Sequence, residues 1–537
     1  MSAPPLGRVA SFGRRLPPNL RTVAARLPGS LAPPIEHGTP TPRVAIIGTG
    51  FGGIGMACRL RQAGIETFTI YEKADAVGGT WRDNTYPGAA CDVPSHLYSL
   101  SFAPKTDWTR RFPEQAEILG YLNEVTDRFD LRPQIRFETE VSAATWDEQR
   151  AVWRIDLADG TADEAEVLVA ATGQLNRPQI PDIDGLDRFE GVTFHSARWN
   201  HDHDLTGRDA AVIGIGASAI QFVPEIAQDC RKLTLFQRSS NFVAPKPDGA
   251  FSEEARERFR RHPWLQRLYR LSIWVRFDAR WLLFRKDSRP ARMLRKRFET
   301  ELSKVVTDDV PAEALLPDYP VGCKRILISN DWYPTLFRPN VQVVTDPVDR
   351  VTPHGVVTGG VEHPVDTIIF GTGFASTGFL APIQVTGRDG RDLHDEWRDG
   401  AEAHLGITVA GFPNLFLLYG PNTNLGHNSI VFMLERQIAY ALTWIRRMVD
   451  DDAATVEVRS AAQADSNARL QRRLERTVCA ASCHSWYKTA TGKITNNWSG
   501  PTIAYWWQTR RPDRADFVTT RQPRRHPVHS GAAGPPE

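Results

Sequence analysis

The chain has 537 residues, of which 41% are hydrophobic and 24% are charged, and its formal net charge is +2. This length allows two or three domains with buried cores, and the composition is typical of a globular protein. The balanced charge gives no electrostatic reason to expect a nucleic-acid partner. No apolar run reaches the ~20 residues that span a bilayer, so no integral membrane segment is expected.

Residues 1–42 are rich in proline and arginine, and Glu36 is their only acid. They lack the apolar core of a secretory signal. We expect a disordered extension, with an organelle transit peptide as the alternative. The polar residues 511–537 are expected to form a disordered tail.

A first strand–helix–strand unit is predicted directly after the extension. The β-branched run 43–50 ends in glycines, helical spacing follows in 53–64, and a second strand in 66–73 ends near Glu72. The turn Gly48-Thr49-Gly50-Phe51-Gly52-Gly53 has the Gly-x-Gly-x-x-Gly pattern that lets a pyrophosphate approach a helix N-terminus. Glu72 can accept hydrogen bonds from a ribose diol, so a dinucleotide site is predicted at Gly48, Gly50 and Gly53.

A second unit of the same kind follows an expected amphipathic helix at 113–130 and a strand at 164–173. Its turn is Gly214-Ile215-Gly216-Ala217-Ser218-Ala219, and its second strand ends at Arg238 and Ser239. An arginine stands where an acid would bind the 2′-hydroxyl of NAD, which favours a 2′-phosphate and therefore NADPH. An exposed arginine without a ligand is the alternative.

Residues 251–305 are predicted to be helical, with breaks at Pro263 and Pro290. The segment 264–286 is basic and aromatic at helical spacing. It is expected to pack on the domain as part of an inserted helical hairpin, and attachment to a membrane surface is the alternative. Strand-to-glycine elements at 366–374 and 414–422 and a long helix at 429–449 complete the pattern.

Strand–glycine–helix units at both ends of the chain predict an α/β fold with two doubly wound, Rossmann-like domains, one inserted in the other. The expected flavin domain comprises 43–185 and 356–510, and the NADP domain comprises 186–355 with a helical insertion at about 251–305. Two nucleotide sites indicate one tightly held flavin and one exchangeable reductant. A disulfide reductase would share this layout, but the first unit is not followed by the close redox cysteine pair that it needs.

The six cysteines are scattered and include no Cys-x-x-Cys pair. This argues against a disulfide scaffold and is typical of a reducing compartment, so a cytoplasmic location is predicted. Cys479, Cys483 and His484 suggest a metal site, but no second pair of ligands accompanies them, and no metal is predicted.

Two motifs identify a family. GGTWRDNTYPGAACD (78–92) resembles the Gly-Gly-x-Trp…Tyr-Pro-Gly-x3-Asp pattern of type I Baeyer–Villiger monooxygenases, which are class B flavoproteins dependent on FAD and NADPH. FEGVTFHSARWN (189–200) is similar to their fingerprint through Phe189, Gly191, His195 and Trp199. The resemblance covers about 43–510. Asn200 departs from the Pro or Asp of the family, whereas Trp199 favours this branch over heteroatom-oxidising relatives, which have Tyr there.

The resemblance implies site residues at matching positions. It implies FAD contacts at Glu72, Thr80, Trp81, Arg82, Asp83, Asp92, Tyr98 and Val141. It implies NADP contacts at Gly214, Ile215, Gly216, Ala217, Ser218, Ala219, Ile220, Gln221, Arg238, Ser239 and Lys324. It also implies a catalytic centre of Arg325 and Asp92, and a tryptophan, Trp486, that closes over the nicotinamide.

The implied reaction inserts one oxygen atom from O2 beside the carbonyl of a small ketone and gives an ester or lactone. Its oxidant is a C4a-peroxyflavin, whose anion the permanently charged Arg325 would stabilise, with Asp92 holding the guanidinium. His195 is interpreted as a linker residue between the domains, without a direct chemical role. Oxygenation of sulfur or nitrogen is the first alternative, and an NADPH oxidase or a nucleotide-binding redox sensor is the second. The sequence predicts neither the ketone nor the oligomeric state.

Overall fold

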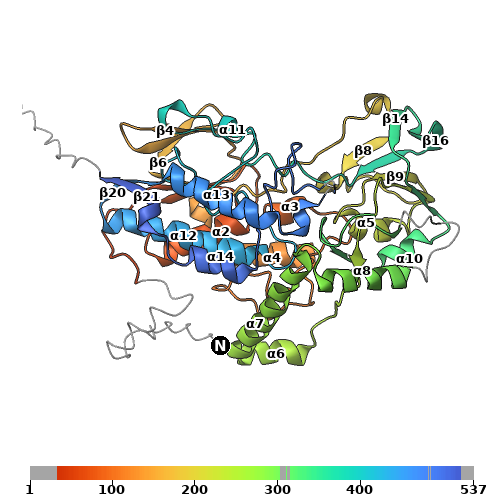
Figure 1. The fold of residues 1–537 in the computed structure, drawn as a ribbon, viewed down its shortest axis with the longest axis horizontal. Coiled ribbons are helices and arrows are strands. Elements are labelled where there is room, and N and C mark those ends of the chain that lie inside the picture. Colours follow the sequence, from red (N-terminus) through yellow and green to blue (C-terminus); the bar gives the residue numbers. More distant parts are fainter. Residues whose placement is uncertain (1–32, 303–309, 311–314, 482, 484, 522–537) are drawn as a thin grey trace, which may run out of the picture.

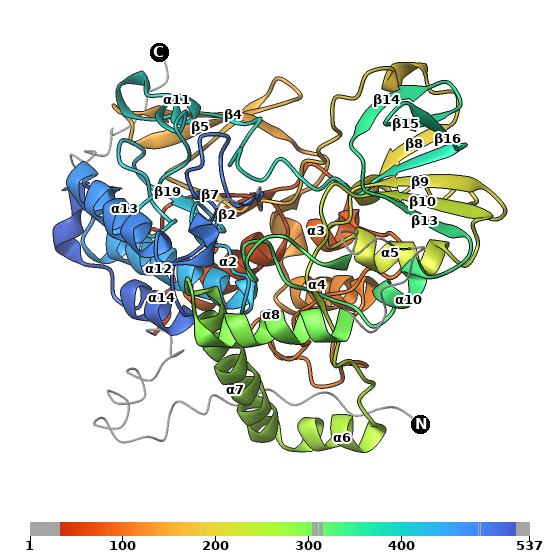
Figure 2. The same cartoon turned by 45° about the vertical axis from the view of Figure 1, so that its right-hand side comes forward.

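The computed structural model of the protein describes residues 33–302, 310, 315–481, 483 and 485–521. Two lobes lie side by side, and each is built on a five-stranded parallel sheet. Helices α6 (Glu253–Arg261) and α7 (Pro263–Ala279) project from beneath the lobes in Figure 1 and in the turned view of Figure 2.

The first sheet holds the first glycine turn. Its strands are buried apolar runs, covered by α2 (Phe51–Gln62), α4 (Gln115–Arg128) and α12 (Ile430–Asp450), which supply most of the surrounding core. Apolar residues on both faces are what a parallel sheet covered by helices requires. The strand order is β19 (Leu415–Leu417), β7 (Val167–Ala170), β1 (Val44–Ile47), β2 (Phe68–Tyr71) and β3 (Ile135–Arg136).

The second sheet holds the second glycine turn and is packed against α5 (Ala219–Ile226) and α10 (Trp332–Leu336). Its strand order is β13 (Val341–Val344), β10 (Lys232–Phe236), β9 (Asp209–Ile213), β17 (Thr367–Phe370) and β8 (Val192–His195). All five strands lie between β7 and β19 in the chain, so the second unit is inserted in the first. The predicted fold class is confirmed.

Smaller elements surround the two sheets. A four-stranded sheet contains β18 (Gln384–Thr386), β4 (Val141–Asp147), β5 (Val152–Leu157) and β6 (Ala162–Ala165), in that order. A three-stranded sheet contains β14 (Val348–Thr352), β15 (Gly355–Thr358) and β16 (Val361–Pro364). In addition, β11 (Val243–Ala244) pairs with β12 (Leu327–Ile328), and β20 (Ala453–Val458) pairs with β21 (Phe517–Arg521). The remaining α-helices of the described residues are α3 (Thr80–Asp83), α8 (Arg289–Leu302), α11 (Leu393–Glu396), α13 (Ser460–Leu474) and α14 (Thr502–Thr509).

The structure differs from the expected boundaries at three places. Strand β17, expected in the second half of the flavin domain, pairs with β8 and β9, so the inserted unit extends past residue 355 to Phe370. Strand β21, in the expected disordered tail, pairs with β20. Ile35, in the expected disordered extension, donates its backbone N–H to the carbonyl of Ala63 at 2.8 Å. Residues 1–32 and 522–537 lie outside the described residues.

The helical segment after the second glycine turn contains α6, α7 and α8. Pro263 is the first residue of α7 and Pro290 the second of α8, where the missing backbone N–H costs nothing because first-turn N–H groups have no helical partner. The inner face of α7 buries Ile273 and Phe277 in the first core. Within the described ranges, no helix is long and apolar enough to cross a bilayer.

Candidate active site between the two glycine turns

A cavity of about 1140 Å³ lies between the two units. The turns that follow β1 and β9 both line it, so it opens at the carboxyl ends of the parallel strands, where α/β folds bind ligands. The predicted site residues line it, with the exception of Gly53 and Ala219. The structure therefore brings nearly all of them together around one space.

The first glycine turn has the conformation and the room that a phosphate needs. Gly48 has φ of 101°, and a Cβ on Gly53 would lie 1.9 Å from the Gly48 carbonyl oxygen. A Cβ on Gly50 would meet nothing within 4 Å. Gly48 and Gly53 are thus required by the backbone, whereas Gly50 faces open space at the N-terminus of α2.

Glu72 lies at the end of β2, as expected, but its carboxylate is already engaged. Oε2 accepts from the backbone N–H of Thr49 at 3.0 Å, and Oε1 accepts from that of Ala74 at 3.0 Å. Arg82 lies 3.1 Å from Oε1. A ribose bound here would share the carboxylate with these donors.

The segment 78–92 forms one wall of the cavity. The Trp81 indole N–H donates to the Tyr98 hydroxyl at 3.1 Å, and Arg82 Nε donates to Asp83 Oδ1 at 2.8 Å. Thr80 and Val141 also line this wall. Gln221, which follows the second glycine turn, bridges the two units. Its Nε2 donates to the Ala90 carbonyl at 2.9 Å and so joins α5 to the first unit.

A cationic group stands at the end of β10. Lys324 Nζ donates to the Ser239 hydroxyl at 2.7 Å and lies 4.6 Å from the centroid of the Tyr319 ring. Burial lowers the pKa of Lys324, and the charge of Arg238 lowers it further. Two cations and a hydroxyl held together in this way favour an anionic ligand.

Arg325 and Asp92 form an ion pair joined by several hydrogen bonds in the cavity. Arg325 Nε donates to Asp92 Oδ2 at 2.8 Å, and Nη2 donates to Oδ1 at 2.7 Å. Asp92 is the largest cause that raises the pKa of Arg325 above its ordinary value. The guanidinium is therefore a permanent positive charge in a fixed orientation, with 28% of its side chain exposed.

Sequence reasoning missed the polar network beside Arg325. Tyr419, in the left-handed region with φ of 64°, donates its hydroxyl to Asn424 Oδ1 at 2.7 Å. Asn424 Nδ2 donates to Asn497 Oδ1, also at 2.7 Å. Tyr419 and Asn424 line the cavity. The glycine turn after β19 could have indicated that these residues lie at the site, because ligands bind at the carboxyl ends of the strands of a parallel sheet.

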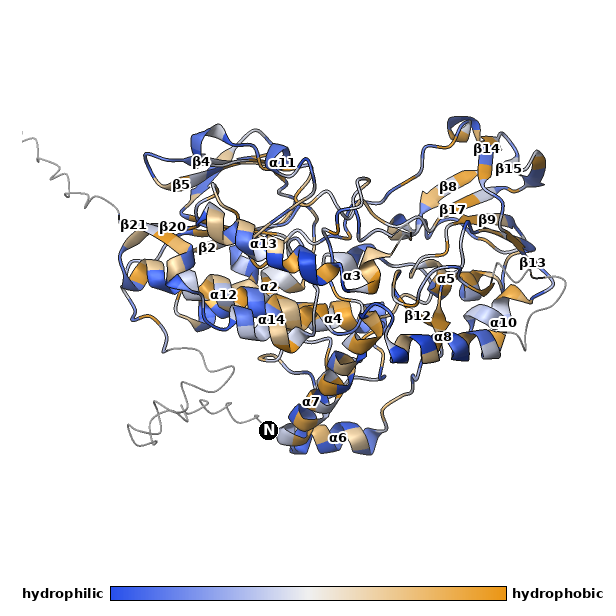
Figure 3. Ribbon diagram, viewed as in Figure 1, coloured by the Kyte–Doolittle hydropathy of each residue, from blue (hydrophilic) through white to orange (hydrophobic). Residues whose placement is uncertain are grey.

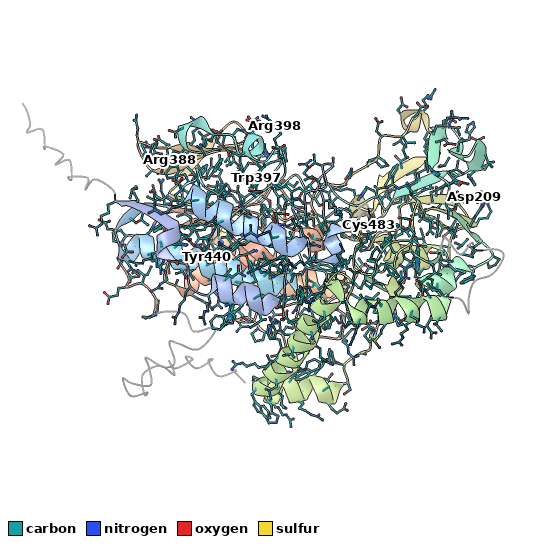
Figure 4. The ribbon with its side chains drawn as sticks, in the orientation of Figure 1. Asp209, Arg388, Trp397, Arg398, Tyr440 and Cys483 are labelled. Atoms are coloured by element: carbon teal, nitrogen blue, oxygen red, sulfur yellow. A yellow bond between two sulfur atoms is a disulfide. The ribbon has the colours of Figure 1, made fainter. Side chains whose placement is uncertain are left out.

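Trp486 lies at the cavity on a segment that is tied to the loop of Arg325. Its carbonyl accepts from the Ser376 hydroxyl at 3.2 Å. Cys483, near the boundary of the lobes in Figure 4, forms a disulfide with Cys323. The scattered cysteines, which argued against a disulfide scaffold, gave no indication of this single bond, and it engages Cys483, one of the residues considered as a metal ligand. His484 lies outside the described residues, and the described part holds no cluster of three or more metal-binding side chains.

The fingerprint 189–200 packs against the second turn. Trp199 lies 5.2 Å from Phe222 of α5, centroid to centroid. His195 is the last residue of β8, and its Nδ1 accepts from the Ala197 N–H at 3.0 Å. Among the described residues, His195 does not line the cavity. Asn200 Oδ1 accepts from the Asp202 N–H at 3.1 Å, a local turn that accounts for its side chain.

Known proteins are similar to this chain in sequence. The family model described as pyridine nucleotide-disulphide oxidoreductase matches residues 45–263. A Baeyer–Villiger monooxygenase of Pseudomonas aeruginosa is 44% identical over 484 residues, which is 90% of this chain and 92% of that protein.

Solved structures match as well. A structure described as oxidized steroid monooxygenase bound to NADP has a TM-score of 0.80 and 32% identity, and covers 90% of this chain and 100% of its own. A structure of OTEMO in complex with FAD and NADP has a TM-score of 0.79 and 29% identity, with the same two coverages.

Proposed function

This chain belongs to the Baeyer–Villiger monooxygenases, and we propose that it uses FAD and NADPH to insert one oxygen atom from O2 beside the carbonyl of a ketone. The product is an ester or a lactone. The observation that carries this proposal is the guanidinium of Arg325, held by Asp92 in the cavity between the two glycine turns.

FAD belongs at the first turn. The open space at Gly50 suits its pyrophosphate, and the wall with Thr80, Trp81, Asp83 and Tyr98 leads from the turn to Asp92. Bound there, FAD supplies the redox chemistry that activates O2.

NADPH belongs at the second turn. Gly214 has φ of 92°, and a Cβ there would lie 2.8 Å from the Gly371 carbonyl oxygen, so the turn requires glycine. Arg238, Ser239 and Lys324 offer two charges and a hydroxyl to the 2′-phosphate. Trp486 stands on the cavity wall where it can cover the reacting ring.

The chemical role of Arg325 follows from its charge. Addition of oxygen to a carbonyl places negative charge on the former carbonyl oxygen, and a preorganised cation stabilises that charge in a site with little water. A guanidinium cannot be deprotonated in this setting, so it does not act as a proton donor. Asp92 touches Arg325 in this structure and acts by positioning it.

The test is product analysis with purified holoprotein, NADPH and isotopically labelled O2 on matched panels of ketones and sulfides. Labelled esters from ketones support the proposal. Sulfoxides without any ester would establish heteroatom oxygenation instead, and NADPH consumption that yields peroxide with every compound would establish an oxidase. Arg325→Ala should still allow NADPH to reduce the flavin but should form no ester.

A further inference from the structure

Helix α7 carries an outward row of large apolar side chains. Trp264, Leu268, Leu271 and Val275 are each about half exposed, between 51% and 57%. Their spacing of four, three and four residues places them on one face of the helix. Isolated exposed apolar residues are ordinary, but a contiguous row indicates an interaction surface.

The row stands where a flat surface can reach it. Helix α7 projects from the body of the molecule, and hydrophobic residues follow it outward in Figure 3. Two further exposed apolar residues, Ile503 and Trp507, lie on α14, which is joined to α7 because Trp274 Nε1 donates to the Thr502 hydroxyl at 3.0 Å. The Arg510 guanidinium lies 3.2 Å from the centroid of the Trp507 ring.

The other face of α7 fixes the helix rigidly. Arg270 Nη1 donates to the carbonyls of His96 at 2.7 Å and Ser99 at 2.9 Å, and Arg270 Nη2 lies 3.6 Å from Glu435. Ile273 and Phe277 are buried in the first core. The apolar row is therefore presented in one orientation by a folded, anchored helix.

The exposed charged side chains of α7 itself have one sign. Arg267 and Arg276 are exposed on α7, and Arg280 is exposed directly after its last residue. The single acid of this helix, Asp278, is turned inward, where Oδ1 accepts from the Thr502 N–H at 2.6 Å and from Asn428 Nδ2 at 3.2 Å. An apolar row flanked by arginine is the pattern of a helix that lies in the headgroup region of a bilayer.

We propose that the outward face of α7 (Trp264, Leu268, Leu271, Val275, with Arg267 and Arg276) docks the protein on an anionic phospholipid surface. A second copy of the chain is the less suitable occupant. Four apolar positions make too short a seam for a stable coiled coil, and two such faces would bring arginine against arginine. Anionic headgroups complement the arginines, while the acyl boundary accepts the apolar row.

The experiment is vesicle flotation of full-length holoprotein without substrate or NADPH, so its result is independent of the proposed reaction. Wild type should float with phosphatidylcholine–phosphatidylglycerol vesicles and remain below with phosphatidylcholine alone. Leu268→Ser/Leu271→Ser should weaken binding at least about tenfold, because two half-exposed leucines lose their transfer to the apolar boundary. Arg267→Glu/Arg276→Glu should abolish the preference for anionic vesicles.

Val361→Ser is the matched control, because Val361 is 61% exposed on β16 of the second unit. It should float like wild type. Equal flotation with both kinds of vesicle, no flotation of wild type, or equal loss in Val361→Ser would overturn the proposal. So would sedimentation that shows a dimer of wild type lost in Leu268→Ser/Leu271→Ser, since the face would then bind a second copy.

Discussion

Asp92 holds the guanidinium of Arg325 by hydrogen bonds from Nε to Oδ2 at 2.8 Å and from Nη2 to Oδ1 at 2.7 Å and to Oδ2 at 2.6 Å. The two residues come from different units, because Asp92 follows the first glycine turn and Arg325 lies on the loop before β12. The position of the catalytic charge therefore depends on how the two units are held together.

Asp92→Asn should lower ester formation while leaving NADPH-driven flavin reduction within a few-fold of wild type. The amide keeps the shape but loses the charge that orients the guanidinium, and loss of such preorganisation costs roughly 10²-fold in rate. Rapid-mixing measurements of flavin reduction and of ester release separate the two steps. Equal decline in both would show that Asp92 serves to bind the cofactor rather than to position Arg325.

Arg325→Lys should form ester with a pH dependence that wild type lacks. Lysine supplies one compact charge that can be lost in a dry site, whereas a guanidinium beside Asp92 keeps its charge. The activity of the variant should fall as pH rises, and the wild-type profile from this residue should be flat. Parallel profiles for the two proteins would contradict this role for Arg325.

Lys324→Ala and Arg238→Ala should each raise KM for NADPH by about 10- to 100-fold while changing KM for NADH by less than about threefold. The dinucleotides differ only in the 2′-phosphate, which the cationic group at the end of β10 is proposed to bind. Ser239→Ala, which removes the hydroxyl bound by Lys324, should have a smaller effect. Equal effects on NADPH and NADH would exclude a 2′-phosphate contact.

Cys323→Ser should reduce the free energy of unfolding by about 2–4 kcal/mol, the usual effect of losing a disulfide that closes a long loop. The bond joins residues 160 positions apart. Cys483→Ser and the double variant should show the same loss, because each removes the same bond. Additive losses, or free thiols at both positions in a non-reducing peptide map, would show that the bond is not formed in solution.

Because its imidazole is buried, His96 should lower the free energy of unfolding as pH falls from about 6.5 towards 4. Burial, with a smaller effect of Arg270, lowers the pKa of His96 to about 4 in the folded state. The unfolded chain therefore binds the proton first, and folding loses at most about 1.4 kcal/mol per pH unit in this window. Above pH 6.5 both states are neutral and the contribution is constant.

Urea unfolding of the holoprotein at several pH values measures this effect. His96→Gln, which cannot be charged, should show a shallower fall in the free energy of unfolding than wild type. His354→Gln is the control, because His354 is 76% exposed. An unchanged slope in His96→Gln would show that the buried imidazole does not titrate as described.

The parts of the fold that the sequence predicted are those with a local signal. Each glycine turn follows a short buried strand and opens a helix, so 43–73 and 209–236 could be read from a few adjacent residues. The pairing of β17 with β8 and β9 has no such signal, since it joins segments about 160 to 175 residues apart. The boundary at residue 355 was wrong for this reason.

The same distinction holds for the site. Arg325, Lys324 and Trp486 could be named because they stand at positions that match a family pattern. The bonds that hold Asn424 to Asn497 and Cys323 to Cys483 come from tertiary contacts between types of residue that occur throughout the chain. Neither an asparagine nor a scattered cysteine carries a local pattern that identifies its partner.

The insertion of one unit in the other also sets an order of synthesis. All strands of the second sheet, from β8 to β17, leave the ribosome before β19, which pairs with β7 at the edge of the first sheet. The inserted unit can thus complete its sheet while its host still presents the unpaired edge of β7. Such an edge is a template for pairing with another chain. The growing protein is consequently most open to misassembly between the emergence of β17 and that of β19, and the arrival of three residues, Leu415–Leu417, ends that interval.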